Sequence, residues 1–386
     1  MKYRRFRHSL LPMAVLLGGL LCSTIRAGTA SRFEMTPEVA RILRAGLDRM
    51  YNYDVKQADA LFDELIQRFP NHTIGYMHKA ELIWWLALMD NTNDTLKETF
   101  RRYNDQSLLK GEELLAQDPN DFYNQLYLGA TYENQTKFYI FISKSYLGAL
   151  TSGMKGYKYI EAAHALRPEY VDCLIGLGAR NYFAGSVPAI FKPFAFLLGS
   201  RGNKQEGIQQ LLRAATSGEF GQTEAKTVLL GVYLNEKKWK DYQELACALI
   251  AQYPANPVLY FWLATAFISQ KHWDEGIHQF EAMIGQYRGD EWQSGLGYGL
   301  YQKGRLEFEK GDTEAVLQSL NRLLKFDFKD QNLMARALLL RAFANDLLKK
   351  RDSALADYRA TLALPNVEET HRKARRYMGK PYSGTR

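Results

Sequence analysis

Small and large apolar residues recur along this chain at a spacing that predicts pairs of packed helices. The clearest case lies in residues 45–70, where six apolar residues form one helical stripe: Ala58, Leu61, Phe62, Leu65, Ile66 and Phe69. Gly46 lies 12 residues before Ala58, and Pro70 blocks continuation of the second helix. Because small residues let two helices approach closely, the segment predicts a helical hairpin.

The same frame recurs in three later segments. Each has two small residues about 12 positions apart, and the pairs are Ala264 with Gly276, Gly304 with Ala315, and Ala342 with Ala354. A large residue follows each pair and fills the space beneath the next hairpin. The pattern resembles the tetratricopeptide repeat (TPR), a unit of about 34 residues. This resemblance implies an all-α, right-handed superhelical solenoid of about eight TPR-like hairpins over residues 36–366.

The repeat is longer in the second to fourth units. Successive prolines at 70, 119 and 168 are 49 residues apart, whereas the spacing after Pro254 returns to about 34. We expect the extra residues between the two helices of each hairpin, at 90–99, 137–152 and 185–203. Equivalent insertions in a solenoid stack on one edge, so the three would form one surface. The alternative is that the first two merely lengthen helices that pack against each other.

The apolar insertion at 185–203 lies in a region with a second resemblance. Residues 173–215 are similar to the TPR family that includes the yeast inclusion-body-clearance protein. The corresponding positions are Pro188, Phe194, Leu197, Leu198, Gly199, Gly202, Gly207, Leu211 and Leu212. That resemblance implies a link to lipid droplets and aggregate clearance without an established chemistry. The same layout is familiar from exported bacterial TPR proteins.

The N-terminus has the pattern of a secretory signal peptide. A basic stretch at 2–7 precedes a 13-residue apolar run at 10–22, and small residues follow. We expect residues 1–27 to be removed, with cleavage after Ala27 or Ala30, and the protein to be exported, periplasmic or secreted. The alternative is an uncleaved N-terminal anchor in the inner membrane. Cys173 and Cys247 then remain, and we expect two buried free thiols, with a disulfide as the alternative.

The net charge of +8 does not predict nucleic-acid binding, because the basic residues gather at the two ends. Five lie in residues 1–27 and six in a basic C-terminal tail at 371–386, with no acidic residue in either stretch. The body between them has a net charge of −3. A nucleic-acid-binding protein usually carries its basic residues on a folded face.

No signature of catalysis or of cofactor binding is present. The run at 199–207 lacks the Gly-Lys-Ser/Thr of a phosphate loop, and Asn203 is expected to be a helix N-cap. His78 and His164 lack metal-ligand spacing and are interpreted as surface or core histidines. We therefore expect no catalytic residue, no cofactor and no metal. An enzyme would need a polar cavity beneath the insertions.

What remains is a binding surface, because the first helices of TPR hairpins line a concave groove. The candidates are Tyr123, Glu133, Asn134, Arg180, Asn181 and Tyr182 in the groove, with Pro188 and Lys192 on the insertion edge. Ordinary packing remains the alternative for each. These residues suit peptide backbones and carboxylates, which favours a non-catalytic scaffold of the cell envelope that binds a protein or peptide. The alternative is a protein that makes peripheral contact with a membrane through the insertion edge and the basic tail.

Overall fold

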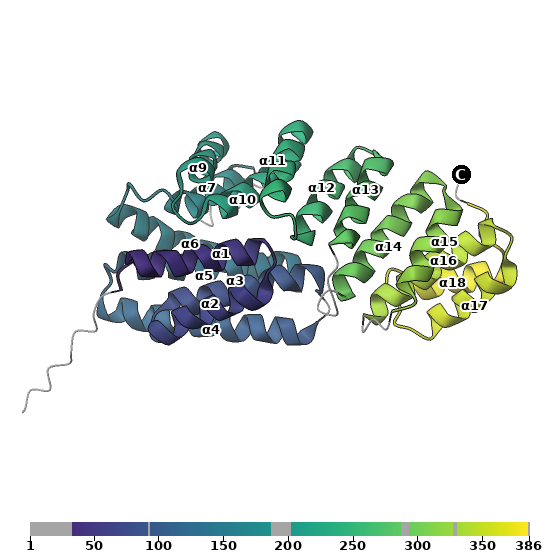
Figure 1. Ribbon diagram of the computed structural model, residues 1–386, viewed down its shortest axis with the longest axis horizontal. Coiled ribbons are helices and arrows are strands. Elements are labelled where there is room, and N and C mark those ends of the chain that lie inside the picture. Colours follow the sequence, from purple (N-terminus) through teal and green to yellow (C-terminus); the bar gives the residue numbers. More distant parts are fainter. Residues whose placement is uncertain (1–32, 92, 187–201, 287–292, 327–329, 385–386) are drawn as a thin grey trace, which may run out of the picture. The chain divides into compact units, whose positions relative to one another are not determined.

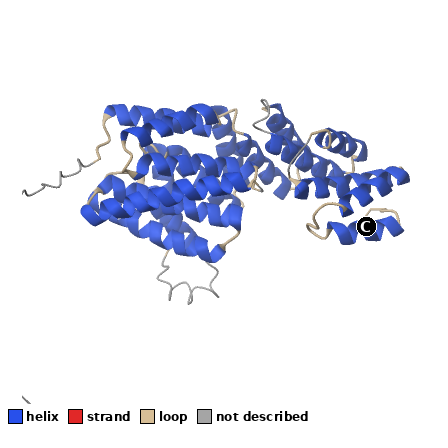
Figure 2. Ribbon diagram, turned by 90° about the horizontal axis from the view of Figure 1, so that it is seen from below, coloured by secondary structure: helices blue, strands red, loops and turns tan. Residues whose placement is uncertain are grey.

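The computed structural model describes residues 33–91, 93–186, 202–286, 293–326 and 330–384, and these residues form helices and connecting loops (Figures 1 and 2). The chain divides into residues 1–33 and a compact unit, Glu34–Arg386. The described part of this compact unit contains seventeen α-helices, one π-helix and no strand, so the predicted all-α class is confirmed. None of the helices there combines the length and apolar character that a bilayer-spanning segment needs.

The helices pair in chain order as eight hairpins, each packed against the next. Hairpins 1 to 4 are α1 (Pro37–Tyr51) with α2 (Val55–Arg68), α3 (Thr73–Met89) with α4 (Asp94–Gln117), α5 (Phe122–Phe138) with α6 (Tyr146–Leu166), and α7 (Cys173–Gly185) with α9 (Lys204–Ser217). Hairpins 5 to 8 are α10 (Gln222–Asn235) with α11 (Trp239–Gln252), α12 (Pro257–Ser269) with α13 (Trp273–Gly285), α14 (Gln293–Lys310) with α15 (Thr313–Leu323), and α16 (Gln331–Leu347) with α17 (Arg351–Leu362). The predicted run of about eight sequential hairpins is thus present.

The small residues of the repeat lie where helices approach most closely. A Cβ on Gly46 would lie only 2.5 Å from the ring of Phe62, so a larger residue would force α1 and α2 apart. Gly129 has the same role in hairpin 3, where a Cβ would lie 2.6 Å from Ile160. Asn203 is the N-cap of α9, as predicted, because its side chain accepts from the backbone amides of residues 205 and 206.

The expected insertions between helices are corrected for the first two long units. Residues 94–99 are the first turns of α4, which has 24 residues, and residues 137–152 end α5, form the π-helix η1 (Tyr139–Ser143) and begin α6. The extra residues lengthen helices because they continue an apolar face: the rings of Phe100 and Phe138 stack at 4.2 Å. The first two segments are mainly helical, so they do not form the loops of the predicted single surface. Most of the third segment, residues 187–201, lies outside the described residues.

Hairpins 1 and 2 also contact hairpins that are far away in the sequence. The side-chain amide of Asn256 donates to the carbonyl oxygen of Tyr51 at 2.8 Å, and Arg44 pairs with Glu219 at 3.0 Å. The indole rings of Trp85 and Trp262 lie 5.5 Å apart. The inner faces of the first hairpins therefore meet the loop before α10 and the start of α12 (Figure 1).

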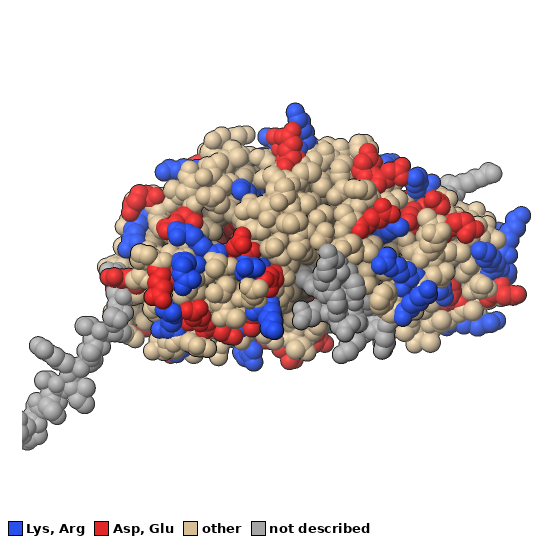
Figure 3. Space-filling view, viewed as in Figure 1, with Lys and Arg blue, Asp and Glu red and all other residues tan. Residues whose placement is uncertain are grey.

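The residues assigned to a basic tail contain a further helix, α18 (Thr370–Gly379), which packs on α17 and α16. The guanidinium of Arg351 donates to the carbonyl of Met378 at 2.6 Å, and the backbone amide of Tyr382 donates to Asp346 at 2.8 Å. Basic and acidic side chains are interleaved over the face in Figure 3, and fewer charges lie over the central helices.

Candidate functional site

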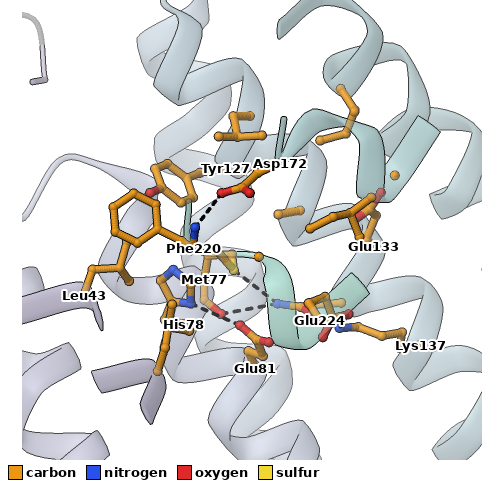
Figure 4. Close-up of a pocket in the computed structure, with 18 of the residues that line it drawn as sticks. Leu43, Met77, His78, Glu81, Tyr127, Glu133, Lys137, Asp172, Phe220 and Glu224 are labelled. Atoms are coloured by element: carbon orange, nitrogen blue, oxygen red, sulfur yellow. Dashed lines mark hydrogen bonds and ion pairs between the residues drawn. The ribbon is translucent and has the colours of Figure 1, made fainter. Parts of the chain in front are cut away.

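A cavity whose mainly apolar lining carries several charged side chains lies among the first helices of hairpins 1 to 5. Its volume is about 100 Å³, and its walls come from α1, α3, α5, α7 and α10, together with Ile160 of α6 and the loops before α7 and α10 (Figure 4). We call it the inner cavity. The polar side chains that line it are Tyr51, His78, Glu81, Tyr127, Glu133, Asn134, Lys137, Tyr170, Asp172 and Glu224. Carboxyl side chains from three helices converge on it.

Helical periodicity explains how single helices contribute several residues. Leu43, Leu47 and Tyr51 of α1 lie four positions apart and share one face. On α5 the lining positions are 126, 127, 130, 133, 134 and 137, which form one stripe. The inner stripe of α5 therefore changes from apolar at its start to charged at its end.

His78 and Glu81 form a buried pair on α3. The Nδ1 atom of His78 lies 3.1 Å from Oε2 of Glu81, and the imidazole stacks on Phe62 at 5.4 Å. Burial alone would raise the pKa of Glu81, but the hydrogen bond from His78 and the charge of Lys137 hold it below its ordinary value. Because Glu81 is a carboxylate, we assign the proton of the neutral imidazole to Nδ1, which leaves a lone pair on Nε2.

Lys137 is the cation of the inner cavity. Its ammonium lies 2.9 Å from a carboxylate oxygen of Glu224 and 4.8 Å from the ring centre of Trp84. Burial alone would lower the pKa of Lys137, but the carboxylates of Glu224 and Glu81 outweigh burial and raise it. The lysine is therefore charged at neutral pH and is neutralised by the protein itself.

Glu133 differs from the other carboxyl groups because it forms no hydrogen bond or ion pair with any described residue. Its side chain lies over Gly176 of α7, where a Cβ would lie 2.1 Å from a carboxylate oxygen. Burial raises its pKa to about 7; Lys137 opposes the rise, and the carboxylates of Glu224 and Glu81 add to it. At neutral pH the site thus holds a carboxyl group that is about half ionised.

Asp172 shapes one wall of the inner cavity. Its two oxygens accept from the backbone amides of Glu219 and Phe220, each at 2.8 Å, and this fixes the loop before α10. Burial raises the pKa of Asp172, and those backbone donors oppose the rise. Arg44 of α1 lies over the ring of Phe220 at 4.8 Å, so hairpin 1 holds the same loop from the other side.

The inner cavity contains two of the residues predicted from the sequence, Glu133 and Asn134. The amide of Asn134 donates to the carbonyl oxygen of Met77 at 3.4 Å, which holds α5 against α3. The binding role of either residue stays a prediction.

The other predicted groove residues lie elsewhere. Tyr123 packs on Phe122 and Tyr170, and Arg180 lies over Tyr157 at 4.3 Å. Asn181 donates to Gln210 of α9 at 2.9 Å, which joins the two helices of hairpin 4.

Tyr182 is fully buried, and its hydroxyl donates to Glu236 at 2.6 Å. These four residues therefore have partners between helices, as the packing alternative predicts. Pro188 and Lys192 lie outside the described residues.

Sequence reasoning missed the other polar lining residues: Tyr51, His78, Glu81, Tyr127, Lys137, Tyr170, Asp172 and Glu224. It treated His78 as a surface or core histidine and placed Lys137 in an insertion. The available signal was the placement of charged residues on the inner stripe of α5. It could not show that α10 supplies Glu224 to the same place, 87 positions from Lys137.

Two further expectations concern ligand-forming side chains. Both cysteines of the described residues are free: Cys173 is buried, but Cys247 is exposed on α11, so the expectation of two buried thiols is half right. Burial raises the pKa of the Cys173 thiol to about 12. Within the described ranges, no three side chains of His, Cys, Asp or Glu are grouped so that they could hold a metal ion.

No protein-family model and no curated protein matches the sequence. The structure is similar to solved TPR-type proteins at low identity. Human IFIT1, a dimer with PPP-AAAA, is 12% identical with a TM-score of 0.45, over 89% of this chain and 86% of that one. Yeast Tom70 is 12% identical with a TM-score of 0.41, over 86% of each chain. A tetratricopeptide repeat protein from Parabacteroides merdae is 11% identical with a TM-score of 0.36, over 78% of this chain and 97% of that one.

Proposed function

We propose that this protein is a non-catalytic, TPR-like scaffold of the cell envelope that binds a protein or peptide partner in the inner cavity. The observation that carries the proposal is the convergence of five first helices on one cavity that holds several charged side chains. A core position is normally filled by apolar side chains, and buried polar groups are normally hydrogen-bonded to each other. Here the Nε2 atom of His78 and the hydroxyl of Tyr170 have no such partner among the described residues.

A cavity-filling variant tests this proposal. Ala130 lines the inner cavity, so Ala130→Phe would fill it, whereas Ala248→Phe adds the same ring to the exposed face of α11. A phage-displayed peptide library is panned on residues 31–386. We expect the enriched peptides to bind the wild-type protein and the Ala248→Phe variant, and not to bind the Ala130→Phe variant. Equal binding to all three proteins, or no enrichment, would contradict a partner in this cavity.

Export is a separate part of the proposal and has its own test. The basic and apolar stretches of the first 27 residues support it. In a bacterial host, cell fractionation should recover the protein in the periplasm with a new N-terminus at residue 28 or 31. A full-length chain in the inner-membrane fraction would support the uncleaved anchor instead.

One observation favours contact with a membrane surface as a second function. Six large apolar side chains are exposed on η1 and the first half of α6: Ile140, Phe141, Tyr146, Leu147, Leu150 and Met154. Leu147 is 77% exposed and Tyr146 is 71% exposed. Between positions 144 and 158 the chain has three lysines and no acidic residue. Apolar groups beside lysines suit an anionic lipid surface.

Vesicle flotation tests that second function. Wild type should float with phosphatidylglycerol vesicles more than with phosphatidylcholine vesicles, and Tyr146→Ser with Leu147→Ser should remove the difference. The control is Leu109→Ser, because Leu109 is 55% exposed on α4. Deletion of residues 185–203 tests the resemblance of residues 173–215 to the lipid-droplet-linked family. Flotation that neither change alters would reject membrane contact at this edge.

A further inference from the structure

Two polar groups without a protein partner face the inner cavity. His78 is only 6% exposed, and its Nε2 atom has no hydrogen-bond partner among the described residues. In Figure 4 this nitrogen lies away from Glu81, on the side of Leu43 and Phe220. The hydroxyl of Tyr170, which also lines the cavity, is the second group. The carboxyl group of Glu133 is half-buried. A buried polar atom without a partner is costly, so two of them in one cavity indicate a ligand that supplies hydrogen bonds.

Both free groups can accept a hydrogen bond, and the hydroxyl of Tyr170 can also donate one. The Nδ1–H group of His78 donates a hydrogen bond to the carboxylate of Glu81, so Nε2 offers a lone pair. Glu133 offers carboxylate oxygens. The strong cationic donor of the cavity, Lys137, is engaged by Glu224 at 2.9 Å. A ligand that matches this arrangement must donate hydrogen bonds and carry positive charge.

The size and the walls of the cavity restrict the ligand further. A volume of about 100 Å³ is smaller than the roughly 150 Å³ engineered cavity that holds benzene, so it admits one side chain and no folded segment. Leu126, Ala130, Ile160 and Ile175 form apolar walls beside Glu133. Apolar walls with one carboxylate suit a chain of methylenes that ends in a cation.

The charge of the lining excludes an anionic ligand. Glu81 and Glu224 are two carboxylates against the single ammonium of Lys137, and Glu133 and Asp172 add further acidic groups. A phosphate or carboxylate would meet these groups without a free cation to receive it. An aromatic or quaternary cation would lack room and would leave the acceptors unpaired.

We propose that the inner cavity binds a primary ammonium group on an aliphatic chain, contributed by a lysine side chain of the partner peptide. The proposal rests on the proposed function and names the chemistry of its ligand. Glu133 receives the ammonium as a carboxylate. When Glu133 is protonated before binding, its proton leaves to solvent. Lys137 remains paired with Glu224.

Three probes test the proposal by calorimetric titration of residues 31–386. They are the tripeptide acetyl-Ala-Lys-Ala-amide, its analogue with norleucine in place of lysine, and n-butylamine. We expect the norleucine peptide to bind at least about tenfold more weakly than the lysine peptide, because it lacks the ammonium. Weaker binding of n-butylamine is expected, since it lacks the peptide backbone. Equal affinity for n-butylamine would reject the peptide as the source of the ammonium.

Glu133→Gln should weaken the binding of the lysine peptide by about tenfold and leave the weak binding of the norleucine peptide unchanged. The matched control is Glu98→Gln, which changes an exposed carboxylate on α4. Circular dichroism of each variant reports whether it is folded. Equal binding of the lysine and norleucine peptides to folded wild type would overturn the proposal.

The ammonium site and the scaffold function fail in different ways. Library peptides could bind the wild-type protein but not the Ala130→Phe variant, with no dependence on a lysine in the peptide or on Glu133. In that case the ammonium site is wrong and the proposed function stands. Alternatively, Ala130→Phe could leave the binding of every peptide unchanged while Glu133→Gln weakens the binding of n-butylamine. In that case the site binds a small amine and the scaffold proposal fails.

Discussion

Buried carboxylates at the C-terminal end and in the inner cavity differ in how many partners they have. In hairpin 8, Asp346 accepts from Arg351 at 2.9 and 3.0 Å, from the hydroxyl of Tyr358 at 2.8 Å and from the amide of Tyr382 at 2.8 Å. Glu133, five hairpins earlier, accepts from no described residue. Both lie between helices of the same repeat type, so the fold does not impose the difference.

That difference separates a structural from a ligand-binding use of charge. The carboxylate of Asp346 joins α16, α17 and the chain after α18, and its desolvation is offset by four hydrogen bonds. In the part of the chain that the structure describes, the buried side-chain atoms without a partner lie between positions 70 and 170, apart from Nε of Arg336. Among the described residues, the C-terminal hairpins thus leave Nε of Arg336 as their one buried unpaired side-chain atom, whereas the inner cavity keeps Nε2 of His78 and the hydroxyl of Tyr170 unpaired.

The largest effect is expected at Asp346. Asp346→Asn removes the charge that pairs with Arg351 and should lower the free energy of unfolding by about 4 kcal/mol, because it leaves a partly buried guanidinium without its anion. Urea unfolding measures the loss. The control is Asp352→Asn, an exposed residue in the first turn of α17, with a loss of about 0.5 kcal/mol. Similar losses would show that Asp346 is not a structural centre.

Glu133 should behave in the opposite direction. Its folded pKa is raised to about 7, so the folded chain binds more protons than the unfolded chain between about pH 4.5 and 7. The contribution of Glu133 to stability is therefore most favourable below about pH 4.5 and falls as the pH rises through 7. Glu133→Gln removes this cost and should raise the free energy of unfolding by up to about 3 kcal/mol at pH 8.

The gain from Glu133→Gln should shrink at pH 5, where wild type is mostly protonated. Urea unfolding at the two pH values measures it. The same variant is expected to bind the lysine peptide more weakly, so stability and binding change in opposite directions. A loss of stability at pH 8 would place Glu133 with Asp346 as a structural group and remove the contrast.

Lys137 tests the charge balance of the inner cavity. Lys137→Met leaves Glu224 without its cation and should lower stability by about 2 kcal/mol at pH 8, with a smaller loss at pH 5. Lys240→Met is the matched control, because Lys240 and Glu244 form an exposed pair and its loss should have almost no effect. Thermal unfolding compares the two, and equal shifts would mean that the cavity pair behaves like a surface pair.

The smallest effect concerns the contact that closes the cavity region. Asn256→Ser retains a cap for α12 and loses the hydrogen bond to the carbonyl of Tyr51, which should cost about 1 kcal/mol. Asn203→Ser changes the exposed cap of α9 in the same way without a distant partner, so its cost should be near zero. An equal effect of the two changes on urea unfolding would show that the Tyr51 contact adds no stability.

Local sequence patterns predicted the hairpins because helix pairing depends on neighbouring residues. The small residue at Gly46 needs only to meet Phe62, 16 positions later, and Asn203 caps a helix that begins at the next residue. The same patterns misplaced the first two insertions, because a helix and a loop of equal length add the same number of residues to a repeat. Burial of Phe100 against Phe138 decides between them.

The sequence by itself determined that this chain is a series of helical hairpins, since periodicity, caps and small residues act over one or two turns of helix. It also placed Glu133 and Asn134 on an inner face. Only the tertiary structure decided what meets that face. Tyr51 and Asn256 are 205 positions apart, and the contact between them depends on the small rotations summed over five hairpins. No single repeat encodes that sum, so the joining of Glu81, Lys137 and Glu224 beside an unpaired Glu133 is visible only in three dimensions.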